Sequence, residues 1–197
     1  MKSGILLTLV ALSLSTSVAL GQDVPSMNDP VKYPRQVISN PPDSIDGKPI
    51  SYYLNHPQID RYSKLYVQAK FSVSDNNPTF AMMDSIETKN PETRPFYLFV
   101  FHRIMDKTDG ALSEAVAGNC DNYFKKNTCD FFALIKHGEY SSYEQQWLSY
   151  FEFSVLWSSK NKVEVIMKLR ENLARNCAGK YSKDLDEIIA RIDNAKQ

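Results

Sequence analysis

The prolines of this chain are concentrated in its first third, where seven of the ten lie between Pro25 and Pro57. Proline has a fixed φ and lacks a backbone N–H, so this density argues against a regular helix and leaves a sheet short of donors. We therefore predict that residues 22–56 form an extended arm with a turn at Asp46–Gly47. The end of the arm is expected to dock on the rest of the chain through Ile50, Tyr52, Tyr53 and Leu54. Full disorder is the alternative for residues 22–44.

The first 21 residues have the three parts of a secretory signal peptide. Lys2 provides the positive start, residues 5–14 form a short apolar run, and Ala19 and Gly21 occupy the −3 and −1 positions of a cleavage site. The apolar run is shorter than the roughly 20 residues that a membrane-spanning helix needs. We therefore predict export to the periplasm or the extracellular space, without membrane insertion after cleavage. A retained anchor is the alternative.

Charge gives no indication of a nucleic-acid partner. Cleavage after residue 21 would remove one lysine and leave 22 basic and 23 acidic side chains, a net charge of −1. Binding to nucleic acid needs a clustered basic face, and binding to an anionic membrane surface needs a polybasic segment. The sequence has neither, so we expect neither partner. The remaining 176 residues are enough for one domain with a sizeable core.

Beyond Pro57 the apolar residues recur at helical spacing, as in the series Ile59, Tyr62, Tyr66. We expect helices to start at Pro57, Asn77–Pro78, Pro95, the Ser141–Glu144 capping box, Asn161 and Ser182, and one to stop at Gly179. Short connections between consecutive helices favour antiparallel neighbours. We therefore predict an all-α domain over residues 57–197, with about eight antiparallel helices in a compact bundle or a short HEAT-like solenoid.

Three cysteines, Cys120, Cys129 and Cys177, follow the predicted arm. An oxidising compartment allows one disulfide and leaves one thiol over. Cys120 and Cys129 are close in sequence, but on two helices of a hairpin their Cα atoms could exceed the roughly 7 Å limit for a bridge. Three buried thiols without any bond are an equally good interpretation, so the pairing stays open.

The stretch from residue 93 to residue 114 combines a dense aromatic run with His102 and a following group of acids. An EF-hand is excluded, because with Gly110 in the sixth place the first, third and twelfth places fall on Met105, Lys107 and Val116. The spacing of His102 and Asp106 places both on one helix face, but zinc needs further ligands that the sequence does not indicate.

We interpret this stretch instead as a buried helix followed by a turn, with a structural polar cluster at the junction. His102 and Arg103 need partners there, which Asp106 or Glu114 could provide. Asp109 is a plausible N-cap of the next helix. The runner-up interpretation is a strand, since the aromatic run also suits a sheet.

No motif for nucleophilic, phosphate-binding or zinc-dependent catalysis is present, so we assign no catalytic residue, metal ligand or cofactor. The aromatic helix 143–157 is either central in the core or partly directed at a partner. Our leading hypothesis is an exported helical protein that binds another protein, as an inhibitor, an immunity-type protein or an envelope accessory protein. The candidate binding residues are Arg103, Asp106, Asp109, Glu114, Tyr143, Trp147 and Trp157.

Two alternatives remain. One is an all-α hydrolase that acts on cell-wall or glycan material through paired carboxylates, which are defined by their distance in space and not by sequence spacing. The other is a structural or ligand-carrying bundle with a closed apolar cavity. The oligomeric state does not follow from the sequence.

Overall fold

A computed structural model of the chain describes residues 42–108, 110–138, 140–157 and 162–194. These residues belong to one compact unit, Arg35–Gln197. The predicted signal peptide and the predicted arm up to residue 41 lie outside the described residues. In the described part, helices dominate and the strands are limited to two pairs of residues, which confirms the all-α prediction.

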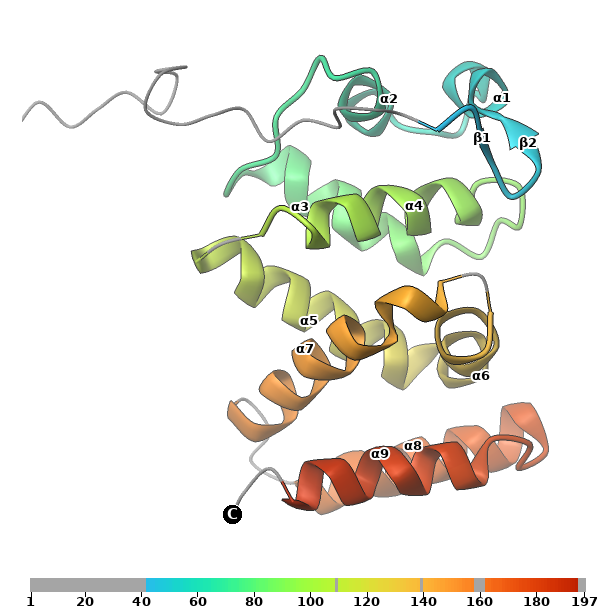
Figure 1. The fold of residues 1–197 in the computed structure, drawn as a ribbon, viewed down its shortest axis with the longest axis vertical. Helices are drawn as coiled ribbons and strands as arrows, with labels where there is room; N and C mark the ends of the chain where they lie inside the picture. The colour runs from blue at the N-terminus through green and yellow to red at the C-terminus, as the bar shows by residue number, and fades with distance from the viewer. Residues whose placement is uncertain (1–41, 109, 139, 158–161, 195–197) are drawn as a thin grey trace, which may run out of the picture. The chain divides into compact units, whose positions relative to one another are not determined.

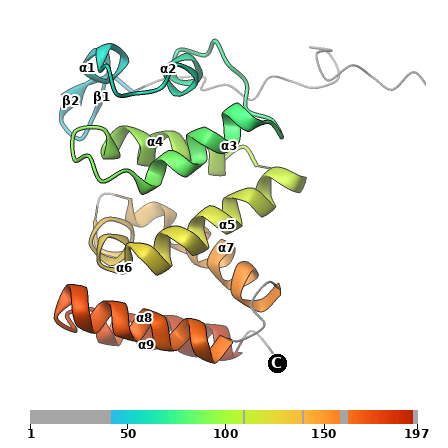
Figure 2. The ribbon, with the colours of Figure 1, turned by 180° about the vertical axis from the view of Figure 1, so that it is seen from behind.

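The helices lie in successive layers (Figures 1 and 2): α3 packs against α4, α5 against α7 and α8 against α9, and the short helices α1 and α2 lie above α3 and α4 in Figure 1. The α-helices of the described residues are α1 (Ile50–Asn55), α2 (Arg61–Val67), α3 (Asn77–Asp84), α4 (Arg94–Met105), α5 (Gly110–Lys126), α6 (Thr128–Asp130), α7 (Glu144–Trp157), α8 (Lys162–Cys177) and α9 (Ser182–Asn194). Two 3₁₀ segments, η1 (Ser85–Glu87) and η3 (Ser141–Tyr143), and a π-helical segment, η2 (Phe131–Lys136), complete the helical part.

A small hairpin precedes the first helix. Strands β1 (Ser44–Ile45) and β2 (Lys48–Pro49) are antiparallel and are joined by the predicted turn at Asp46–Gly47. Both turn residues have positive φ, 49° and 69°, as a tight two-residue hairpin turn requires. Tyr53 docks this segment as predicted, because its ring is buried against Phe96 and its hydroxyl donates to the Ile45 carbonyl at 3.1 Å.

Helix α1 departs from the predicted extended conformation of residues 22–56. Its six residues include no proline. Pro49 precedes the helix directly, and Pro57 lies two residues after its end. Proline is tolerated at both places, since neither would donate a hydrogen bond inside the helix. The high proline content of residues 22–56 is therefore compatible with a short helix, because α1 fits between Pro49 and Pro57.

The start of α2 also differs from the prediction. Asp60 caps the helix by accepting a hydrogen bond from the Ser63 backbone N–H at 2.9 Å, so the helix begins at Arg61 and not at Pro57. It ends before Ala69, which has a φ of +57°. Helix α3 starts as predicted, with Asn76 as its N-cap and Pro78 in its first turn.

Helix α4 forms the centre of the core. Its residues face packed neighbours around most of the circumference, as predicted for a helix with apolar side chains on all sides. The buried residues of α4 are Phe96, Tyr97, Leu98, Val100, Phe101, His102, Ile104 and Met105. Helix α7 is also a core element, since Trp147 and Phe151 are almost completely buried.

No helix in the described part is long and apolar enough to cross a membrane.

Candidate functional site

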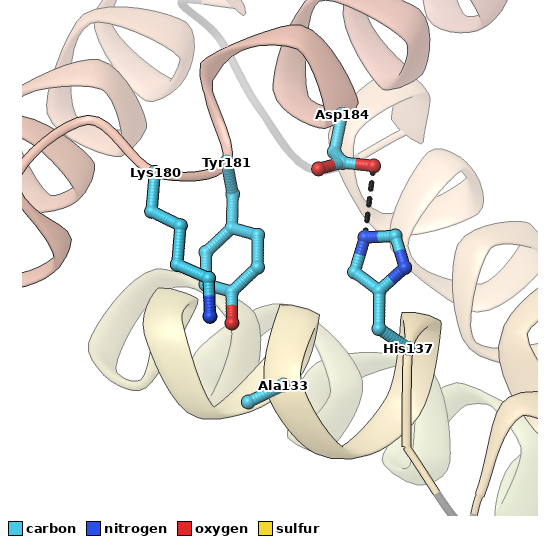
Figure 3. A pocket seen from close by; sticks show the side chains of 5 residues that line it. All are labelled: Ala133, His137, Lys180, Tyr181 and Asp184. Carbon is cyan, nitrogen blue, oxygen red and sulfur yellow. Dashed lines mark hydrogen bonds and ion pairs between the residues drawn. The ribbon is translucent and has the colours of Figure 1, made fainter.

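A surface hollow of about 510 Å³ lies between the π-helical segment η2 and the turn that leads into α9. Its lining consists of Ala133, His137, Lys180, Tyr181 and Asp184 (Figure 3). Two parts of the chain more than forty residues apart supply these side chains. A hollow of this volume can hold one small ligand group or one side chain of a partner.

The first wall has an unusual backbone. The His137 N–H donates to the Phe132 carbonyl at 3.0 Å, which is the five-residue step of a π-helix. Gly138 follows directly, and a Cβ atom at this position would lie 2.4 Å from the Ala133 carbonyl oxygen. Only glycine fits without a shift of this wall. Single π-helical turns occur frequently at functional sites.

The second wall is the tight connection between α8 and α9. Helix α8 ends at Cys177, and Ala178 and Gly179 follow with φ values of +48° and +71°. Gly179 was predicted as this stop, since glycine adopts positive φ without steric cost. The reversal directs Tyr181 back onto η2, where its ring stacks on Phe132 with the centroids 5.2 Å apart.

A disulfide joins the two walls. Cys129 lies just before η2, Cys177 ends α8, and their Cα atoms are 5.7 Å apart. The pairing that the sequence left open is therefore Cys129 with Cys177. Cys120 is the remaining thiol and is fully buried. Burial raises the pKa of this thiol well above its ordinary value, and the nearby charge of Asp121 raises it further, so Cys120 is unreactive.

An ion-pair cluster lies beside the hollow. The Lys136 ammonium approaches Glu144 and Asp184 at 3.5 Å and Glu187 at 3.0 Å, and His137 Nε2 lies 3.0 Å from Asp184 Oδ1. Desolvation lowers the pKa of Lys136, but the hydrogen bond with Glu187 and the charges of the three carboxylates raise it by more. Lys136 therefore stays protonated, and it fixes the carboxylates on α7 and α9 around the end of η2.

The cluster brings carboxylates together in the manner that the hydrolase alternative requires. Because Glu144 and Asp184 both lie 3.5 Å from the Lys136 ammonium, their nearest oxygens are at most about 7 Å apart, and the carboxyl groups of glycosidase pairs are roughly 5–9.5 Å apart. The Lys136 ammonium forms an ion pair with each of the two carboxylates.

The sequence-predicted residues assemble at another place, the junction of α4 with η3 and α7. Arg103 Nη1 lies 3.6 Å from Asp106 Oδ2, and the same oxygen accepts a hydrogen bond from the Tyr143 hydroxyl at 3.2 Å. Asp106 thus provides the predicted partner of Arg103. All three side chains are partly exposed, so they form a polar rim on the surface of the core.

His102 lies directly below this rim, but its partner is not one of the expected acids. Its Nε2 accepts a hydrogen bond from Trp147 Nε1 at 2.8 Å, and its ring lies between those of Tyr140 and Tyr143 with centroid distances of 4.6 and 4.1 Å. Desolvation by burial lowers the pKa of His102 to about 3, and the Leu98 backbone raises this pKa by less. His102 is therefore a neutral core residue. Trp147 is fully buried beside it.

The remaining predicted binding residues do not join this rim. Glu114 is exposed on α5, and no contact places it beside Asp106. Asp109 lies outside the described residues, as does the side chain of Trp157 at the end of α7. In the part of the chain that the structure describes, no group of three or more His, Cys, Asp or Glu side chains could hold a metal ion.

Sequence reasoning missed the hollow. His137 and Asp184 are far apart in the sequence, and no spacing or motif links the two. The one sequence feature that could have linked the two walls is a disulfide between Cys129 and Cys177, but the sequence left the pairing of the three cysteines open. Comparison with family models, with curated proteins and with solved structures found no match.

Proposed function

We propose that this chain is an exported binding protein, of the inhibitor, immunity or envelope accessory kind, and that its protein partner contacts the hollow at His137. One observation supports this proposal: polar side chains line the hollow, and its two walls, η2 and the α8–α9 connection, are held in fixed positions. The disulfide, the Phe132–Tyr181 ring contact and the Lys136 ion pairs each tie η2 to the α8–α9 connection. Pre-organised walls lower the entropic cost of binding.

The exposed edges of the hollow suit recognition. Lys180 is exposed at its rim, and Glu187, on the neighbouring turn of α9, has 70% of its side chain accessible. Both charge signs are therefore available to a partner, and charged groups across an interface contribute to specificity and to the association rate. The polar rim formed by Arg103, Asp106 and Tyr143 is a second candidate contact surface.

Affinity capture with a matched pair of variants tests the proposal. The bait is the purified protein, and the source is the secreted or envelope fraction of the native host. Lys180→Glu changes a residue that lines the hollow, whereas Lys183→Glu makes the same charge change on an exposed residue of α9 that does not line it. We expect one partner that Lys180→Glu loses and Lys183→Glu retains, with binding reproduced by the purified partner. Capture that is equal for both variants would contradict the assignment to this hollow.

A paired-carboxylate hydrolase is the second candidate, because Glu144, Asp184 and Glu187 converge on Lys136. If the protein has this function, it should hydrolyse cell-wall or glycan material, and Glu144→Gln and Asp184→Asn should each abolish the hydrolysis. A purified protein that folds correctly and releases no reducing sugar from such material would eliminate it.

A further inference from the structure

A second hollow lies between the α1–α2 connection, η1 and the first turn of α4, and we call it the amide pocket. Its volume is about 330 Å³. Every side chain that lines it carries a hydroxyl or an amide group, and none carries a charge. The lining residues are Gln58, Ser85, Thr88, Asn90, Thr93 and Tyr97. Such a lining suits a neutral ligand with many hydrogen-bonding groups better than an ion or an apolar ligand.

Hydrogen bonds hold the groups of the amide pocket close together. Asn90 Nδ2 donates to Gln58 Oε1 at 2.6 Å, and the Tyr97 hydroxyl donates to the Gln58 carbonyl at 3.4 Å. The Asn90 N–H donates to Thr88 Oγ1 at 3.3 Å. The amides of Gln58 and Asn90 are therefore neighbours in fixed positions. Gln58 Nε2 donates no hydrogen bond within the described part of the chain, so a ligand can accept from it while it donates to the second lone pair of Oε1.

The aromatic pocket, a hollow of about 380 Å³, borders the amide pocket at residues 56–58. The rings of Tyr52 and His56 belong to its wall, with their centroids 5.7 Å apart. The Gln58 N–H donates to His56 Nδ1 at 3.3 Å, and His56 Nε2 lies 3.4 Å from Glu92 Oε2. These contacts tie the two pockets together. The lining residues of the aromatic pocket are Pro49, Ser51, Tyr52, Asn55, His56 and Pro57.

We infer that the amide pocket and the aromatic pocket together bind a neutral saccharide of at least two units. A sugar hydroxyl can donate and accept hydrogen bonds at once, and the neighbouring amides of Gln58 and Asn90 provide both functions. The next unit would pack the C–H face of its ring on Tyr52, because the face of an aromatic ring is negative and attracts C–H groups. This site is separate from the hollow at His137 and does not depend on the function proposed for that hollow.

Two other ligand classes fit the pair of pockets less well. An acidic or basic ligand would find no charged side chain in either lining other than His56. A proline-rich peptide could pack on the rings of the aromatic pocket, since such peptides bind to aromatic grooves. It would leave the hydrogen-bonding groups of the amide pocket unused.

An array of immobilised oligosaccharides, with neutral and acidic members, tests the inference on the unmodified protein. We expect binding to neutral members, and we expect calorimetry with one of these sugars in solution to reproduce it. No binding to any member, or binding to acidic members alone, would overturn the inference.

A matched pair of variants locates the sugar. Gln58→Glu keeps the Oε1 acceptor for Asn90 but replaces the Nε2 donor by a carboxylate oxygen, so the sugar should bind about three- to tenfold more weakly. Gln68→Glu makes the same change on an exposed residue at the end of α2 that lines neither pocket, and it should leave the affinity unchanged. Lys180→Glu, at the hollow near His137, should leave it unchanged as well. Equal affinities of Gln58→Glu and Gln68→Glu, or a loss of sugar binding in Lys180→Glu, would overturn the assignment to the amide pocket.

Discussion

The neutral state of His102 makes the stability of the core dependent on pH. The folded protein protonates His102 only near pH 3, whereas the unfolded chain protonates it near the ordinary value of 6.5. Between these two values the unfolded state binds more protons, so a fall in pH through this window favours unfolding. From about pH 7.5 to about pH 5, protonation of His102 in the unfolded chain should cost about 2 kcal/mol of the unfolding free energy.

The measurement is equilibrium urea unfolding at both pH values, followed by far-UV circular dichroism with the disulfide intact. The control is His102→Gln, whose amide oxygen can accept the hydrogen bond from Trp147 Nε1 but does not titrate. The two other histidines, His56 and His137, are present in both proteins and cancel in the comparison. We expect the original protein to lose about 2 kcal/mol more than the variant over this pH interval. Equal losses in the two proteins would refute the reasoning.

Four further predictions concern the cysteines and glycines. A thiol assay without reductant should detect no thiol in the native protein and one in denaturant, that of Cys120; three thiols would disprove the Cys129–Cys177 bond. Replacement of both bonded cysteines by serine should cost up to about 4 kcal/mol, because the bond closes a loop with a sequence separation of 48, and urea unfolding measures this loss. Gly138→Ala should cost about 1–3 kcal/mol by the same assay, since its Cβ would clash with the η2 backbone. Gly118→Ala, on α5 with open space around the new Cβ, should be neutral or stabilising by up to about 1 kcal/mol.

The elements that the sequence predicted well are those whose signals are local. The predicted Asn77–Pro78 start lies at the beginning of α3, the Asp46–Gly47 turn forms a hairpin, and Gly179 follows the end of α8 in the turn that stops this helix. In each case the residue type acts through its own backbone preference or through a hydrogen bond to a near neighbour. Such preferences do not depend on the rest of the fold, so they can be read from one short segment.

The start of α2 shows where local signals compete. Both Pro57 and Asp60 are favourable start residues, and Asp60 prevails because its side chain reaches the Ser63 N–H. The π-helical turn of η2 could not be predicted, since its register depends on the close approach of Gly138 to the preceding turn. Helices, their approximate order and a buried α4 therefore followed from sequence, while exact ends and irregular turns did not.

The candidate site was less predictable than the fold, because distance in space decides it. Arg103 and Asp106 lie one helical turn apart, and the sequence correctly suggested that they pair. His137 and Asp184 are separated by 47 positions, and only the packing of the α8–α9 hairpin on η2 brings them together. No periodicity or motif records such a contact.

The Cys129–Cys177 bond makes the hollow conditional on its chemical surroundings. Cys129 lies just before η2 and Cys177 ends α8, so reduction of the bond would remove the covalent tie between the two walls and leave noncovalent contacts, among them the Tyr181 ring contact and the ion pairs, to align them. If the proposed export and the proposed binding at the hollow hold, the walls would be poorly aligned while the chain is in a reducing compartment, and oxidation would align them. Ligand affinity itself would report the redox state of the compartment.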